Sequence, residues 1–335
     1  MRIRLLIAVV ALQVLVLGYM AGEREWIVRK GTIIHLQTAP LDPRDPFRGN
    51  YVRLDYGINH VPVKFLRGGL AGKPRKGEDR IAADTQVYAV LRNSSGGIAT
   101  LDYLTDEKPA GGLFIRGRVD RYWSGDVIPV RYGLEAYFMQ ESRAKELEGR
   151  RRRDGIQVPL EMEVAVSGKG VSVLKGYGWS SLGIGLKLDT VSSPNRQVRA
   201  ATVQLMNVSS NDLAVVDLPG AQSFELKDDW LRSWGNHEWA WVMADKPRAT
   251  HVTDDQVVVL KPGEQREIHV DLTQPYWFVA KEKEAAISIR DLQRGGMFRL
   301  IYRPPSPEEC KGLKQAALIW HGELPTSAFG GGRVD

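Results

Sequence analysis

The segment from Leu160 to Leu174, LEMEVAV-SGKG-VSVL, contains the clearest fold signal in the chain. Apolar residues alternate with glutamate up to Val166, small polar and glycine residues follow, and a second β-branched run begins at Val171. Alternation of this kind is typical of a half-buried strand, and a glycine-containing turn between two such runs is typical of a hairpin. The sequence therefore predicts an antiparallel β-hairpin at this position.

The same pattern recurs along the chain on both sides of this hairpin. Short runs rich in β-branched and aromatic residues, bounded by Pro, Gly, Asn or Ser, occur at 32–36, 51–56, 85–91, 98–101, 113–119, 199–208, 214–218, 256–260, 266–272, 297–302 and 316–320. Strands separated by regular turn signals favour a sandwich or barrel. We therefore expect a mostly β protein with two antiparallel β domains.

Composition suggests where these two domains meet. The chain becomes rich in Gly and Ser around residues 179–193, which we interpret as a linker between a first β domain at 25–178 and a second at 194–335. In the second domain, the turn at 261–264 (KPGE) leads into an alternating strand. This pattern resembles, in a general way, the immunoglobulin-like sandwich modules of exported bacterial proteins.

An apolar segment precedes the β pattern. Arg2 and Arg4 are followed by an apolar run from Leu5 to about Ala21 and then by charged residues. Such a run is at the short end of a membrane-spanning helix, and arginines before it favour a cytoplasmic N-terminus. We expect residues 1–24 to be a retained anchor in the inner membrane, with the bulk of the chain in the periplasm or extracellular space. A cleaved secretory signal and a buried core helix are the alternatives.

Charge and cysteine usage narrow the classes of function. The 335 residues include 46 Lys and Arg and 40 Asp and Glu, which gives a net charge of +6. The sequence has no basic helix and no module that combines aromatic and basic residues, so we do not expect nucleic-acid binding. The one cysteine, Cys310, cannot form an intrachain disulfide. The six histidines lack metal-site spacing, so neither a metal nor another cofactor is expected.

The most distinctive motif spans residues 40–56, PLDPRDPFRGNYVRLDY, and a second block, YGLEAYF, spans 132–138. With the apolar segment, these blocks resemble the membrane-anchored bacterial family named for its GDYxxLxY signature. The matching residues are Asp42, Arg44, Arg48, Gly49, Tyr51, Leu54 and Tyr56, followed by Gly133, Glu135 and Tyr137. Asn50 stands at the signature aspartate. The resemblance covers about Trp26 to Gly178 and implies an anchor but no activity.

Alternation along the signature strand predicts two faces with different roles. Asn50, Val52, Leu54 and Tyr56 would face the core, while Tyr51, Arg53 and Asp55 would lie on the other face. We expect Arg53 and Asp55 to face water or a partner, which makes them candidate partner-binding residues. In the second block, Glu135 would either pair with an arginine of the signature region or remain solvated.

Tryptophans cluster between residues 230 and 241 of the second domain. Trp230, Trp234, Trp239 and Trp241 are interleaved with acidic residues and a histidine. Exposed tryptophans can stack on sugar rings or anchor a protein interface, whereas buried ones fill a core. This cluster is therefore a candidate glycan- or partner-binding site, with core packing as the alternative.

These features predict a non-enzymatic binding, scaffold or assembly component of the bacterial envelope, with a membrane and a protein as its partners. A carbohydrate-binding module built on the tryptophan cluster is the main alternative. An envelope hydrolase is a further alternative and would depend on residues such as Ser142 or Glu135. The motif Ser142-Arg143-Ala144-Lys145 matches Ser-x-x-Lys, but no Lys-Thr-Gly sequence follows it, so we expect no catalytic site.

Overall fold

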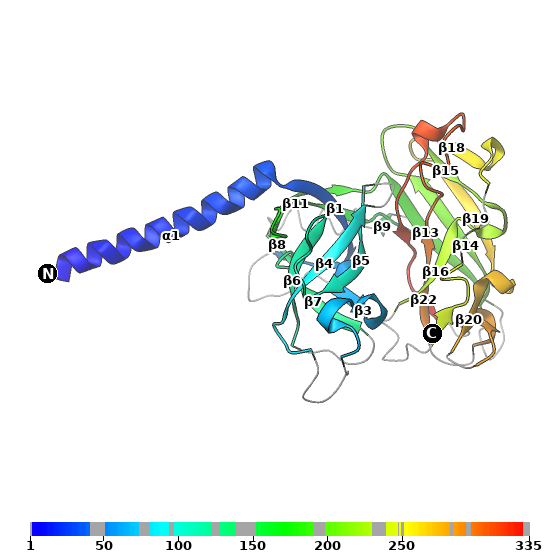
Figure 1. Cartoon of the computed structure of the whole chain (residues 1–335). Helices are drawn as coiled ribbons and strands as arrows, with labels where there is room; N and C mark the ends of the chain where they lie inside the picture. The colour runs from blue at the N-terminus through cyan, green and yellow to red at the C-terminus, as the bar shows by residue number, and fades with distance from the viewer. Residues whose placement is uncertain are drawn as a thin grey trace.

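The computed structural model describes residues 2–40, 51–73, 81–93, 97–121, 127–138, 152–153, 155–190, 198–229, 239–246, 248, 251–281, 284–292 and 296–330. Two β lobes lie side by side, and a long helix projects from one of them (Figure 1). We call residues 32–179 the N-terminal lobe, apart from two short strands at 152–157, and residues 182–330 the C-terminal lobe. The predicted mostly β fold with an N-terminal apolar helix is confirmed.

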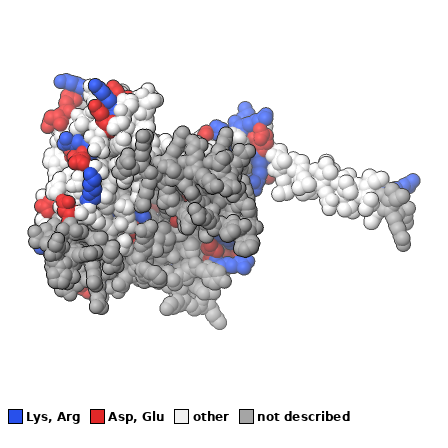
Figure 2. All heavy atoms as spheres, turned by 180° about the vertical axis from the view of Figure 1, so that it is seen from behind, with Lys and Arg blue, Asp and Glu red and all other residues white. Residues whose placement is uncertain are grey.

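Helix α1 (Arg2–Lys30) is 29 residues long and continues beyond the predicted anchor at 1–24. The apolar side chains between Leu5 and Met20 are exposed, with Leu15 69% exposed, and the surface of the helix is uncharged along most of its length (Figure 2). Within the described residues, it is the one helix long and apolar enough to cross a membrane. It ends where the Gly31 amide donates to the Ile27 carbonyl oxygen at 2.7 Å and the chain turns into the first strand.

The N-terminal lobe is built from two antiparallel sheets. One has the order β12-β11-β1-β2-β8 and the other β3-β7-β6-β4-β5. Their strands are β1 (Thr32–Pro40), β2 (Tyr51–Tyr56), β3 (His60–Pro62), β4 (Gln86–Asn93), β5 (Ala99–Thr105), β6 (Phe114–Val119), β7 (Val127–Arg131), β8 (Ala136–Phe138), β11 (Leu160–Val166) and β12 (Ser172–Trp179). The predicted hairpin is confirmed as β11 and β12, with an irregularity between Glu163 and Val164.

The core of the N-terminal lobe lies between these two sheets. Alternate residues of β1 and β11, such as Ile34 and Val164, pack with residues of the second sheet, such as Ile115 and Ile128. Each of these side chains is at most 1% exposed. The period-two pattern of the sequence therefore places one face of each sheet in a shared apolar interior.

The C-terminal lobe has one long sheet, of order β19-β14-β13-β10-β9, and three smaller ones, β15-β18, β16-β22-β23 with β24 beside β22, and β17-β20-β21. Its strands are β13 (Leu182–Thr190), β14 (Val198–Asn207), β15 (Leu213–Val216), β16 (Phe224–Asp228), β17 (Ala240–Trp241), β18 (Val257–Leu260), β19 (Gln265–Asp271), β20 (Phe278–Ala280), β21 (Ile287–Ser288), β22 (Met297–Tyr302), β23 (Leu324–Pro325) and β24 (Phe329–Gly330). Aromatic residues such as Trp277 and Phe224 fill its core. The immunoglobulin-like comparison stays a prediction.

The junction between the lobes differs from the predicted linker at 179–193. Residues 182–190 form β13, a central strand, and the chain passes between the lobes at Ser180 and Ser181. The short strands β9 (Arg152–Arg153) and β10 (Ile156–Gln157) lie beside the C-terminal lobe: β10 pairs with β13, and β9 pairs with β10. A Cβ atom on Gly183 would lie 2.6 Å from the Ile156 side chain, so the glycines make room for this contact.

Candidate functional site: the groove at the base of the long helix

The signature strand and the second block, separated by about eighty residues, are joined directly by hydrogen bonds. The Leu54 amide donates to the Glu135 carbonyl oxygen at 2.9 Å, and the Tyr56 hydroxyl donates to the Leu134 carbonyl oxygen at 3.0 Å. Leu54 and Tyr56 are buried, as predicted for the core face of the strand. The two family blocks therefore form one structural unit.

Asn59 lies at the centre of this unit and is 5% exposed. Its side-chain oxygen accepts from the Tyr56 amide at 2.8 Å, and its side-chain nitrogen donates to the Val130 carbonyl oxygen at 2.8 Å and to Glu135 Oε1 at 3.1 Å. The same Glu135 oxygen accepts from the Tyr132 amide at 2.6 Å. Glu135 is therefore held by an asparagine and a backbone amide, an arrangement that the sequence analysis did not predict.

Burial controls the protonation of the two tyrosines of this network. It raises the pKa of Tyr56 and of Tyr132 far above the ordinary value, and the nearby Glu135 carboxylate raises each further. The Tyr132 hydroxyl donates to the Ile58 carbonyl oxygen at 3.0 Å. Both phenols therefore remain neutral at physiological pH and act as structural hydrogen-bond donors.

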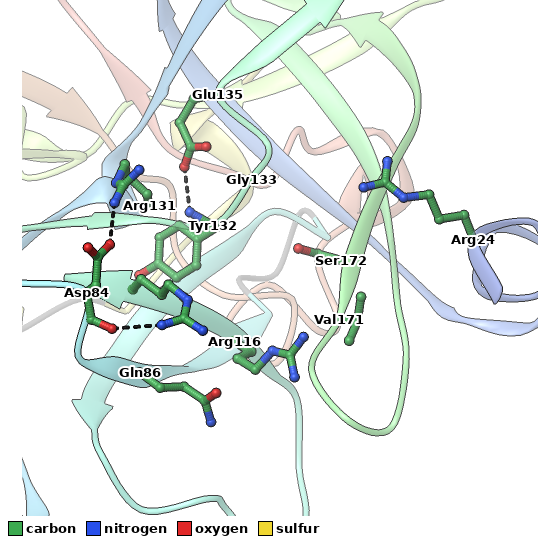
Figure 3. A pocket seen from close by; sticks show the side chains of 12 residues that line it. Arg24, Asp84, Gln86, Arg116, Arg131, Tyr132, Gly133, Glu135, Val171 and Ser172 are labelled. Carbon is green, nitrogen blue, oxygen red and sulfur yellow. Dashed lines mark hydrogen bonds and ion pairs between the residues drawn. The ribbon is translucent and has the colours of Figure 1, made fainter. Parts of the chain in front are cut away.

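A groove of about 500 Å³ opens beside this network, at the base of α1 (Figure 3). It is lined by Arg24, Asp84, Gln86, Arg116, Gly117, Arg118, Arg131, Tyr132, Gly133, Glu135, Val171 and Ser172. Gly133 and Glu135, predicted as signature residues, thus lie in its wall. Four arginines face two carboxylates, so the groove has an excess of positive charge.

The sheet places three of these arginines close together. Arg116 and Arg118 alternate on β6 and so share a face, and Arg118 lies directly opposite Arg131 of β7. Like charges directly opposite each other in an antiparallel pair are destabilising. Asp84 compensates in part, because its carboxylate lies 2.8 Å from Arg131 Nη2 and its carbonyl oxygen accepts from Arg118 at 2.9 Å.

Two glycines shape the groove. A Cβ atom on Gly117 would lie 2.8 Å from the Tyr132 ring, so that ring packs across β6 only because position 117 has no side chain. Gly170, in the β11–β12 turn, has φ +76° and its carbonyl oxygen accepts from the Arg116 amide at 2.8 Å. The hairpin that brings Val171 and Ser172 to the groove is thereby fixed to β6.

Asp55 corrects the predicted outer face of the signature strand. It is 8% exposed, and its Oδ1 lies 2.7 Å from His60 Nε2. The expectation that Asp55 faces water or a partner is therefore wrong. A turn from residue 57 to 59 brings His60 back beside the strand, and simple alternation does not include that turn.

The other signature residues are only partly described. Tyr137 packs edge-on against Tyr177, with 5.7 Å between ring centroids. Tyr51 and Arg53 have a described backbone in β2, where Arg53 pairs with Ala136 of β8. Asp42, Arg44, Arg48, Gly49 and Asn50 lie outside the described residues.

The predicted tryptophan cluster is also partly described. The Trp241 indole N–H donates to the Tyr276 carbonyl oxygen at 2.6 Å, and its ring stacks on Trp277 at a centroid distance of 6.3 Å. Trp239 packs against the core of the C-terminal lobe, with Lys281 Nζ 4.8 Å from its ring centroid. Trp230 and Trp234 lie outside the described residues. For Trp241, these contacts correspond to the core-packing alternative.

The sequence did not predict the roles of Asn59 and Tyr132 or the arginine face, although part of the signal was present. Arg116 and Arg118 alternate within a run that was predicted to be a strand, which places them on one face. Their approach to Arg131 and Arg24 depends on tertiary structure. Within the described residues, no group of three His, Cys, Asp or Glu side chains is arranged to hold a metal ion.

The fold and the groove define a two-lobed β protein with one N-terminal helix apolar enough to span a membrane. Residues 13–176 match the model of the GDYXXLXY protein family. The N-terminal half of the chain, including the asparagine network and the groove, therefore belongs to this family, as the signature predicts. Comparisons with curated proteins and with solved structures give no match.

Proposed function

We propose that the protein is a single-pass component of a bacterial inner membrane that holds its two lobes on the extracytoplasmic side and binds another envelope component without catalytic turnover.

The observation that carries the proposal is the joint between α1 and the N-terminal lobe. Ile27, near the end of the helix, is 3% exposed. A Cβ atom on Gly31 would lie 2.6 Å from the Ile27 carbonyl oxygen and 3.0 Å from that of Val166. The helix and the lobe are therefore in direct backbone contact.

The dimensions of α1 support anchoring. The uncharged stretch from Leu5 to Gly22 is about 27 Å long at 1.5 Å per residue, close to the roughly 30 Å of a bilayer's hydrocarbon core. Charged residues begin at Glu23, and Arg24 follows. The arginines at positions 2 and 4 favour a cytoplasmic N-terminus. The β lobes would then lie on the opposite side of the membrane.

The chemistry of the groove supports binding more than turnover. Glu135 is engaged by Asn59 and the Tyr132 amide, and Asp84 is engaged by Arg131. Burial keeps the Tyr56 and Tyr132 phenols neutral. A general acid or base needs a pKa near the working pH, and these tyrosines are far from it. The remaining arginines are suited to recognising an anion.

Cross-linking in native membranes tests the binding role. Tagged full-length chain would be compared with Arg53→Glu, on the signature strand, and with Arg92→Glu, an exposed arginine on β4, as the matched control. We expect one envelope protein to be captured by the wild type and by Arg92→Glu and to be lost with Arg53→Glu. Absence of any specific cross-linked protein, or a substrate turned over by the purified chain, would contradict the proposal.

A carbohydrate-binding module remains the second candidate because the Trp239 ring is partly exposed. A glycan array with the full-length chain and with Trp239→Ala tests it. The carbohydrate proposal requires glycan binding that disappears in the variant while its circular dichroism spectrum is unchanged. The assembly proposal expects no tryptophan-dependent binding of glycan.

A further inference from the structure

We propose that the arginine groove at the base of α1 binds the phosphate of an anionic membrane lipid. This inference rests on the proposed anchoring of α1. The proposed function does not say what the groove binds, and the inference names a class of ligand for it. The proposal depends on three observations: the charge of the groove, the partners of its arginines, and its position relative to the apolar part of the helix.

Within the described part of the chain, carboxylates neutralise the positive charge of the groove only in part. The Asp84 and Asp120 carboxylates lie 2.8 Å and 3.4 Å from the Arg131 guanidinium, whereas Asp84 accepts from Arg118 only through its carbonyl oxygen. Among the described residues, no carboxylate lies within ion-pairing distance of Arg24 or Arg116. Placing Arg118 opposite Arg131 costs stability through like-charge repulsion, and a bound anion would offset that cost.

The arginines that line the groove come from three elements of the fold, α1, β6 and β7. Arg116 extends from β6 toward the hairpin that carries Val171 and Ser172, while Arg24 approaches from α1 on the far side of that hairpin from Asp84 (Figure 3). Arginine recognises phosphate oxygens through a planar set of N–H donors. A phosphate group in the groove would therefore meet donors from more than one direction.

Position identifies a lipid as the source of the phosphate. Arg24 lies two residues beyond Gly22, where the uncharged run of α1 ends, a rise of about 3 Å along the helix. The polar headgroup layer on each side of a bilayer is roughly 5–7 Å deep. The groove shares Arg24 with the helix, so it opens at the level of the lipid headgroups.

Lipid retention by the full-length chain tests this assignment. The protein in non-ionic detergent would be incubated with equal amounts of phosphatidylglycerol and phosphatidylcholine with identical acyl chains, and the lipid retained after gel filtration would be measured by mass spectrometry. We expect the wild type to retain phosphatidylglycerol preferentially. The double variant Arg116→Gln/Arg118→Gln should bind it roughly 30-fold more weakly, since each arginine near an anionic surface contributes about 1 kcal/mol.

Two further variants control for charge and folding. Arg92→Gln/Lys227→Gln removes the same charge from exposed strand positions away from the groove and should retain the wild-type preference. Arg116→Lys/Arg118→Lys keeps the charge of the groove and should retain most of the preference for phosphatidylglycerol. Equal retention of phosphatidylglycerol by the wild type and the Arg116→Gln/Arg118→Gln variant would overturn the proposal. Displacement of bound phosphatidylglycerol by inorganic phosphate at equal concentration would also overturn the proposal, because it would identify a site for free anions.

Extraction with alkaline carbonate separates failure of this inference from failure of the anchoring proposal. If α1 is not an anchor, the wild type itself leaves the membrane. If only the lipid assignment is wrong, all variants stay in the membrane and retain phosphatidylglycerol to the same extent.

Discussion

Asn59 is the residue on which the family-specific part of the fold depends most. Its side chain joins the signature strand, through the Tyr56 amide, to β7 and the second block, through Val130 and Glu135. Because it is buried, its loss would leave several polar groups without partners and without water. An unsatisfied buried group costs about 1–3 kcal/mol.

We expect Asn59→Ala to lower the free energy of unfolding by about 2–4 kcal/mol, since it breaks three hydrogen bonds at once. Denaturant titration of the full-length chain in non-ionic detergent would measure the change. Asn93→Ala, at an exposed position at the end of β4, is the matched control and should stay within about 0.5 kcal/mol of the wild type. A similar stability for the two variants would disprove the central role of Asn59.

Substitution of Ser172 should not destabilise the protein, in contrast to substitution of Asn59. Its hydroxyl is shielded from water and has no hydrogen-bond partner in the described structure, so the free energy of unfolding already includes the cost of that unmet bond. Ser172→Ala should leave the free energy of unfolding unchanged or raise it by up to about 1 kcal/mol. The same denaturant titration measures it, and a loss above about 1 kcal/mol would reveal a hydrogen bond that the structure does not contain.

At the scale of single residues, the sequence predicts burial better than it predicts partners. Alternation correctly places Leu54 and Tyr56 in the core. It fails for Asp55, because a partner only five positions later, His60, returns to the strand through a tight turn. One of the two partners of Glu135, Asn59, also comes from tertiary structure, since it is far from Glu135 in sequence.

At the scale of elements, the joint between α1 and the N-terminal lobe determines how the helix is fixed to the lobe. Gly31 allows the end of the helix to approach the backbone of β11 at Val166. Its amide closes the last turn of the helix by donating to Ile27. An alanine at this position would place a methyl group against backbone atoms, which cannot move as a flexible side chain can.

We therefore expect Gly31→Ala to loosen the joint, with faster hydrogen–deuterium exchange from residues 27 to 36 and little change in the C-terminal lobe. Gly22→Ala is the matched control, because a Cβ atom there meets nothing within 4 Å. Exchange mass spectrometry of the full-length chain in detergent compares the two. Identical exchange in both variants would show that the helix is not fixed to the lobe.

The junction between the lobes explains why the linker prediction differs from the structure. Glycine-rich composition normally indicates a loop. In β13, however, Gly183 and Gly185 accommodate the Ile156 side chain, so the glycines belong to a central strand. The hairpin of β11 and β12 could be predicted because its signal is local, whereas the β10–β13 contact depends on a pairing that no local pattern contains.

At the scale of the whole molecule, buried tyrosines predict how stability depends on pH. Burial raises the folded-state pKa of Tyr56, Tyr132 and Tyr302 above the ordinary value of 10.0. The unfolded chain loses the phenol protons at a lower pH than the folded protein does. The stabilisation is therefore complete below the pKa of the unfolded chain and is lost as the pH rises above it. We expect the free energy of unfolding to fall above about pH 10, by up to about 1.4 kcal/mol per pH unit for each tyrosine.

Denaturant titrations between neutral pH and pH 12 would measure this slope. Tyr132→Phe removes one titrating group and should make the alkaline slope shallower by about 1.4 kcal/mol per pH unit, at the cost of one hydrogen bond, about 1 kcal/mol, at neutral pH. An unchanged alkaline slope in the variant would mean that Tyr132 ionises in the folded state as readily as in the unfolded chain.

We expect α1 to anchor the chain in a membrane and the two lobes to lie outside the cytoplasm. The native Cys310 is buried and its thiol pKa is raised by burial, so Lys261→Cys supplies one reactive thiol at an exposed turn. Labelling of intact spheroplasts with a membrane-impermeant maleimide should modify this variant, and the full-length labelled chain should remain in carbonate-washed membranes. Labelling only after lysis, or recovery of the chain in the soluble fraction, would contradict the account.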